Sequence, residues 1–127
     1  MKKLLVALVA VIGMALPAFA DPVEGMWKTE VDDGAYAHVE VYQCGAKICG
    51  KIVRTFKSDG EYQSPNIGTD IIRGMVAQGS GKYEGEVWRP SNNKIYFGKL
   101  ILSGDSLKMK GCLSVGFPCK SQDWSRL

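Results

Sequence analysis

The sequence has little of what most catalytic and metal sites need. It contains a single histidine, His38, and no C-x-x-C pair, so neither a local catalytic triad nor a thioredoxin-like redox motif can be assembled. Lysine and arginine form no cluster of the kind that binds nucleic acid. No apolar run reaches the roughly 20 residues of a transmembrane helix. We therefore expect no enzyme, no metal, no cofactor, no nucleic-acid partner and no membrane anchor.

The first twenty residues are typical of a cleavable secretory signal peptide. A basic start at Lys2-Lys3 precedes the apolar run Leu4–Leu16, and Ala18-Phe19-Ala20 supplies a small-x-small cleavage pattern. We predict a signal peptide over 1–20 and a single mature domain over 21–127, periplasmic or secreted. An uncleaved N-terminal helix is the alternative. Of the 16 basic residues two leave with the signal, so 14 remain against 13 acidic ones and the domain is nearly neutral.

Four cysteines lie in the predicted mature domain, and an even number in an oxidising compartment indicates two disulfides. Of the three pairings that four cysteines allow, we expect the local pairs Cys44–Cys49 and Cys112–Cys119. A four-cysteine zinc site is the alternative, although the spacings are wider than the C-x₂-C usual for zinc.

Alternation of apolar and polar residues dominates the mature sequence, which is the pattern of half-buried β-strands. We expect about eight strands, over residues 27–31, 35–42, 47–52, 71–77, 82–88, 94–102, 106–112 and 120–127. Turn residues break the pattern from Thr55 to Asp70, which predicts a long loop to which we assign no role. Regular turns and the absence of a helical pattern indicate an all-β, antiparallel up-and-down meander. Such a sheet hides its edges by closing into a small barrel.

The second and third strands are expected to form a hairpin around Gly45-Ala46. If Cys44 lies directly opposite Cys49, Val41 meets Ile52 on one face and the cysteines are close enough for a disulfide. One register then satisfies both the apolar face and the disulfide.

The two ends of the domain carry a pair of residues with a structural meaning. Trp27 stands in Gly25-Met26-Trp27 at the start of the first strand, and Arg126 lies in the last strand. A guanidinium above an indole ring would tie these strands together and close the barrel. The pair resembles the signature of the lipocalin-like, or calycin, barrels, which implies that both residues act in barrel closure.

A wider pattern resembles the exported bacterial family called domain of unknown function 2147. The matching segments are 21–29, 41–53, 94–100, 107–112 and 119–127. The resemblance implies a lipocalin-like barrel in the periplasm, and it implies no activity. Residues 55–70 are the stretch least like the family.

A barrel of this size predicts binding of a small apolar or amphipathic ligand. By alternation the candidate lumen residues are Val39, Val41, Ile52, Tyr83, Val87, Phe97, Met109 and Trp124. The alternative is a protein-interaction module, an envelope factor or a lysozyme inhibitor. For the latter, the segment Gly79-Ser80-Gly81-Lys82-Tyr83 resembles the loop of the membrane-bound C-type lysozyme inhibitors, which enters the lysozyme cleft. His38 is expected on the outer face, with Glu40 and Tyr42.

Overall fold

A computed structural model describes residues 20–114 and 116–127, so the predicted signal peptide lies outside the described residues except for Ala20. Nine strands follow one another, and no helix occurs among the described residues. They are β1 (Gly25–Lys28), β2 (Ala35–Cys44), β3 (Lys47–Lys57), β4 (Gly60–Tyr62), β5 (Asp70–Gly79), β6 (Lys82–Arg89), β7 (Lys94–Ser103), β8 (Ser106–Cys112) and β9 (Cys119–Arg126).

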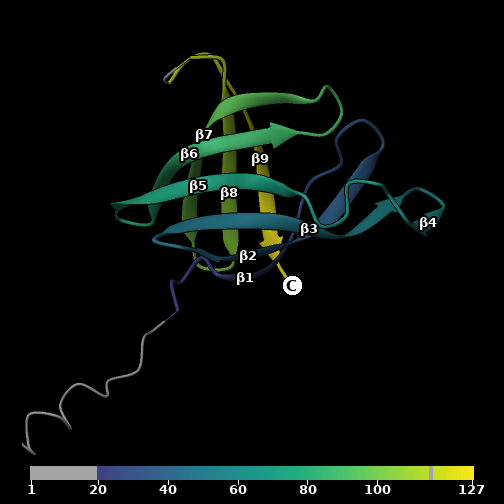
Figure 1. The fold of residues 1–127 in the computed structure, drawn as a ribbon, viewed down its shortest axis with the longest axis horizontal. Coiled ribbons are helices and arrows are strands. Elements are labelled where there is room, and N and C mark those ends of the chain that lie inside the picture. Colours follow the sequence, from purple (N-terminus) through teal and green to yellow (C-terminus); the bar gives the residue numbers. More distant parts are fainter. Residues whose placement is uncertain (1–19, 115) are drawn as a thin grey trace, which may run out of the picture.

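Eight of these strands form a closed antiparallel barrel, which confirms the expected fold. The sheet order is β2-β1-β9-β8-β7-β6-β5-β3-β4, and an additional β2–β3 pairing closes the circle. In Figure 1, β3, β5 and β6 run in front of β8 and β9, which cross behind them as the opposite wall. Closure leaves no unpaired edge in the barrel itself.

The predicted long loop over 55–70 is wrong for its first part. Strand β3 continues to Lys57, and after a tight turn the short strand β4 pairs back on it, with Thr55 opposite Tyr62. Outside the barrel Arg54 forms a bidentate ion pair with Glu61. This hairpin projects beyond the barrel (Figure 1). Strand β4 has only three residues and begins within one turn signal, Ser58-Asp59-Gly60, shortly before another, Ser64-Pro65-Asn66. The sequence pattern therefore does not reveal it.

Both expected disulfides are present, but the predicted hairpin register is wrong by two residues. A two-residue turn at Gly45-Ala46 places Cys44 opposite Lys47, so Cys49 lies opposite Tyr42. The two cysteines are therefore diagonal neighbours on one face, with Cα atoms 5.8 Å apart. The tight turn decides the register, and the disulfide adapts to it. The second bond, Cys112–Cys119, joins directly opposed residues of β8 and β9.

Three glycines in register allow the barrel wall to bend. Gly98 of β7 lies opposite Gly85 of β6 on one side and Gly111 of β8 on the other. A Cβ atom at Gly98 would lie 2.6 Å from a Val87 methyl carbon and 2.8 Å from the Met75 methyl carbon. The missing side chains let the core pack directly against the strand backbones.

One end of the barrel is filled by side chains. Trp27 is fully buried and its indole donates a hydrogen bond to the Val23 carbonyl. Trp27 pairs with Arg126 across the β1–β9 seam, and the guanidinium carbon lies 4.3 Å from the ring centre. The same guanidinium donates to the carbonyls of Glu24 and Pro22. The arrangement is the one expected for a residue pair that holds the first and last strands together.

Candidate functional site

The other end of the barrel is open. The β1–β2 connection, the segment that joins β4 to β5, the β6–β7 turn and the β8–β9 loop surround a cavity of about 620 Å³. This exceeds the roughly 300 Å³ at which small-molecule pockets begin. The interior is thus divided, with a packed core beneath Trp27 and an open cavity towards the mouth.

The floor and walls of the cavity are mainly apolar. Ile52 from β3, Val87 from β6 and Met109 from β8 are buried beneath it, together with Ala37 and Ile71. These side chains come from strands on all sides of the barrel, so the apolar surface encloses whatever enters. Three of the eight residues predicted to face a ligand therefore line the cavity.

Four other predicted ligand residues lie inside the barrel but within its packed core. Val39, Val41, Tyr83 and Trp124 are each less than 5% exposed and do not line the cavity. The Tyr83 hydroxyl donates a hydrogen bond to the Asp21 carboxylate at the filled end, and its burial raises the pKa of the phenol. Alternation identifies inward side chains, but it does not say at which depth the core ends.

Phe97 was expected to face the lumen, and this is wrong. It is opposite the exposed Glu86, and Lys99 on the same outer face lies over its ring. The inward positions of β7 are those of Tyr96, Gly98, Leu100 and Leu102. Both faces of this strand are apolar in sequence, so the pattern by itself cannot show which face is inside.

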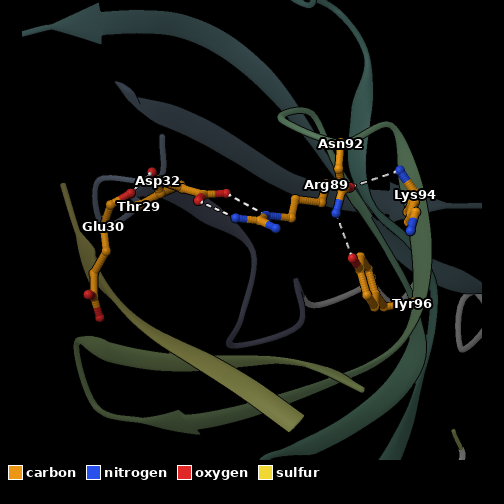
Figure 2. A network of polar contacts seen from close by, with 7 residues as sticks. All are labelled: Thr29, Glu30, Asp32, Arg89, Asn92, Lys94 and Tyr96. Atoms are coloured by element: carbon orange, nitrogen blue, oxygen red, sulfur yellow. Dashed lines mark hydrogen bonds and ion pairs between the residues drawn. The ribbon is translucent and has the colours of Figure 1, made fainter. Parts of the chain in front are cut away.

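An ion pair crosses the mouth of the cavity (Figure 2). Arg89 donates from Nε and Nη2 to the two carboxylate oxygens of Asp32, at 2.9 and 2.8 Å. Asp32 is held at the base of the Asp33-Gly34 turn, where both residues have positive φ, and its backbone pairs with Ala35. Arg89 is the last residue of β6. The pair therefore fastens the β1–β2 connection to the opposite wall.

The electrostatics of this pair favour its ionised form. The hydrogen bond from Arg89 lowers the pKa of Asp32 against the opposing effect of burial, and the charges of Arg89 and Lys120 lower it further. The bond to Asp32 in turn raises the pKa of Arg89. Both side chains stay partly accessible, at 36% for Arg89 and 29% for Asp32. The pair is thus within reach of a molecule in the cavity.

Several other polar groups of the wall already have partners within the chain. The Thr29 hydroxyl accepts from the Ala37 backbone, and the Thr55 hydroxyl donates to the Tyr62 carbonyl. Among the described residues that line the cavity, the positively charged side chains are Arg89 and Lys120.

Exposed apolar side chains surround the mouth. Val31 of the β1–β2 connection is 65% exposed, and Leu113 and Phe117 of the β8–β9 loop are 74% and 78% exposed. Val31 and Leu113 also line the cavity. Exposed apolar residues grouped at the rim of a concave site are typical of a binding surface.

Comparison with known proteins places the chain in a family. The model of the family described as "Uncharacterized protein conserved in bacteria (DUF2147)" matches residues 25–126. The chain belongs to the DUF2147 family. Its fold is similar to that of the protein HP1028 from the human pathogen Helicobacter pylori, described as belonging to the lipocalin family. The TM-score is 0.72 at 16% identity, over 86% of this chain and 84% of that chain. At this identity the likeness shows the fold alone. A comparison with curated proteins finds no match.

In this DUF2147 chain, Asp32 and Arg89 are among the cavity residues that the sequence did not predict. Both residues begin segments of turn-forming residues, Asp32-Asp33-Gly34 and Arg89-Pro90-Ser91. A usable signal existed, because in a meander of eight strands every second connection lies at the same end of the barrel. The two turns therefore lie at the same end of the barrel, and they contribute one charged residue each, of opposite sign.

The remaining candidates are placed as follows. His38 is on the outer face and packs against Phe56 with the rings tilted, their centres 4.6 Å apart. The segment 79–83 forms the β5–β6 turn, and its tyrosine is buried, so Tyr83 does not project from the turn. Because all four cysteines are in disulfides, none has a thiolate for zinc. Across the part of the chain that the structure describes, no group of three or more His, Cys, Asp or Glu is placed to hold a metal.

Two disulfides fit a periplasmic or extracellular protein. Over residues 20–114 and 116–127 we find no helix with the length and apolar character needed to cross a membrane.

Proposed function

We propose that this protein is a periplasmic binding protein for a small amphipathic molecule. The observation that carries the proposal is the mouth cavity, with an apolar floor and a charged rim inside a barrel whose other end is filled. The floor would hold the apolar part of the ligand, and Arg89 and Lys120 would meet its polar part. The proposal assigns binding and no reaction.

Export of the protein is supported by the contacts of Asp21, the first residue of the predicted mature domain. Its backbone nitrogen donates to the Glu24 carboxylate at 2.8 Å, and its carboxylate accepts from Tyr83. A mature chain that begins here would keep both contacts. Intact mass measurement of the protein from the periplasmic fraction should give the mass of residues 21–127 less four hydrogens. A mass that includes residues 1–20, or four reactive thiols, would contradict export with oxidation.

Binding can be tested with the neutral fluorescent probe N-phenyl-1-naphthylamine. We expect it to bind the mature protein at micromolar concentration with a rise in fluorescence. Gly111→Phe should abolish binding, because a Cβ atom at this position meets only Tyr96, at an ordinary 3.5 Å, and the new ring would occupy the cavity.

The matched control is Val76→Phe, which adds a phenyl ring at an exposed position of β5 outside the cavity. This variant should bind the probe like the wild type, and circular dichroism should show that both variants are folded. If the probe does not bind, or if both variants bind it equally, the cavity is not the binding site. Native mass spectrometry of protein purified without denaturant would then identify any co-purified molecule.

The protein-interaction alternative stays a prediction. It is tested by adding the mature protein to a C-type lysozyme activity assay. No inhibition at micromolar concentration would exclude the lysozyme-inhibitor form of it.

A further inference from the structure

The Asp32–Arg89 pair has the geometry with which an arginine binds a ligand carboxylate. Two parallel N–H donors of the guanidinium meet two carboxylate oxygens, at 2.9 and 2.8 Å. The pair lies on the wall of the cavity rather than outside the barrel. In Figure 2 the two side chains extend towards each other from opposite sides of the mouth. The Asp32 carboxylate thus occupies the Arg89 guanidinium, the strongest anion-binding group of the cavity.

The local charge leaves room for a second anion. Lys120 lies close enough to lower the pKa of Asp32, and it forms no ion pair among the described residues. Glu30, the other carboxylate at the mouth, accepts a hydrogen bond from the backbone nitrogen of Asp123. Glu30 keeps its negative charge but forms no ion pair with Arg89 or Lys120 among the described residues, so Asp32 is the carboxylate bound to Arg89, and Lys120 has no ionic partner there. An incoming anionic group would meet Lys120 as well as Arg89, whereas a neutral group would gain much less from either.

We propose that Asp32 is a displaceable stand-in for the anionic head group of the ligand. The ligand class is an amphiphile with an apolar body and a carboxylate or phosphate head. This inference rests on the proposed function, because the apolar body must lie on the cavity floor. The head group accepts the two N–H bonds of Arg89, and the Asp32 carboxylate moves into water.

The exchange also releases a contact that spans the mouth. Asp32 belongs to the connection between β1 and β2, and Arg89 belongs to β6, so their bond ties this connection to the far wall. The backbone pairing of Asp32 with Ala35 is local and survives the exchange. Binding of the anion and loosening of the β1–β2 connection are therefore one event.

The test compares three probes with the same twelve-carbon chain, which are dodecanoate, dodecyl phosphate and dodecan-1-ol. The affinity of each is measured by its displacement of the neutral fluorophore N-phenyl-1-naphthylamine. Asp32→Asn keeps the shape of the side chain but removes its charge. It should raise the affinity for both anions about three- to tenfold, the range expected when a partly exposed ion pair no longer competes. The affinity for dodecan-1-ol should stay within about twofold. Arg89→Gln should reduce the affinity for both anions to the level of the alcohol.

Glu61→Gln is the matched control, because it neutralises the other bidentate arginine–carboxylate pair, Arg54–Glu61, which lies outside the barrel. It should change none of the three affinities. A gain for one anion alone supports the inference and identifies the head group.

Three results would overturn the inference. The first is an equal gain in affinity for all three probes in Asp32→Asn, which would make Asp32 only a lid. The second is a loss of anion affinity in that variant. The third is no effect of Arg89→Gln on any affinity. If the alcohol and the neutral fluorophore bind but no anion does, the inference fails and the proposed function stands. If no probe binds the wild type, the proposed function itself fails.

Discussion

Replacement of Arg126 by methionine tests the role of the filled end in closing the barrel. Methionine keeps an unbranched apolar side chain above Trp27 but removes the charge and the N–H donors. The guanidinium lies 4.3 Å from the centre of a fully buried indole, while its own side chain is 27% exposed. The cation–π contact is then worth about 1–2 kcal/mol.

Hydrogen bonds add to this loss. Arg126 donates to the backbone carbonyls of Glu24 at 3.1 Å and Pro22 at 2.9 Å, each worth about 0.5–1 kcal/mol at a partly exposed site. Its ion pair with Asp105 contributes almost nothing, because the Asp105 side chain is 87% exposed. The free energy of unfolding should therefore fall by about 2–4 kcal/mol, a large part of the total for a small domain.

The assay is urea unfolding of the oxidised protein, followed by tryptophan fluorescence. The midpoint should move down by about 1–2 M. Arg54→Met is the control. Arg54 lies over Phe56 at 5.5 Å and pairs with Glu61 on the exposed outer surface, where such contacts contribute little, so the midpoint should move little. Binding of the neutral probe should survive in both variants at low urea, because the cavity lies at the other end. A loss below about 1 kcal/mol for Arg126→Met, or an equal loss in the control, would refute the closure role.

Three further outcomes are expected from urea midpoints or probe titrations. Desolvation and two nearby cations lower the pKa of His38 below its ordinary 6.5, so the unfolded chain binds this proton more tightly. The free energy of unfolding should therefore fall as the pH drops through 6.5, and His38→Gln should remove that part of the dependence. Gly98→Ala should cost about 1–3 kcal/mol through overpacking, whereas Gly111→Ala should be near neutral. Replacing Cys112 and Cys119 by serine should cost about 2 kcal/mol and weaken probe binding at the mouth, and an unchanged midpoint would contradict this.

The sequence alone determined most local structure, because local structure depends on neighbours in the chain. Alternation placed all eight barrel strands, and turn residues such as Asp33-Gly34 marked where they end. The pairs Cys44–Cys49 and Cys112–Cys119 followed from short separations in the chain, each within its own hairpin. Trp27 and Arg126, at the two ends of the domain, were matched because a meander that closes must bring its first and last strands together.

Tertiary structure decided what depends on distance across the barrel. The register of the first disulfide followed from the geometry of a two-residue turn, which composition does not reveal. Phe97 faces outward because strand pairing, rather than hydrophobicity, selects between two apolar faces of β7. The depth at which the core ends, and hence the cavity, depends on how side chains from all strands fill the interior. Asp32 and Arg89 are 57 residues apart, and only closure of the barrel brings their opposite charges together across its mouth.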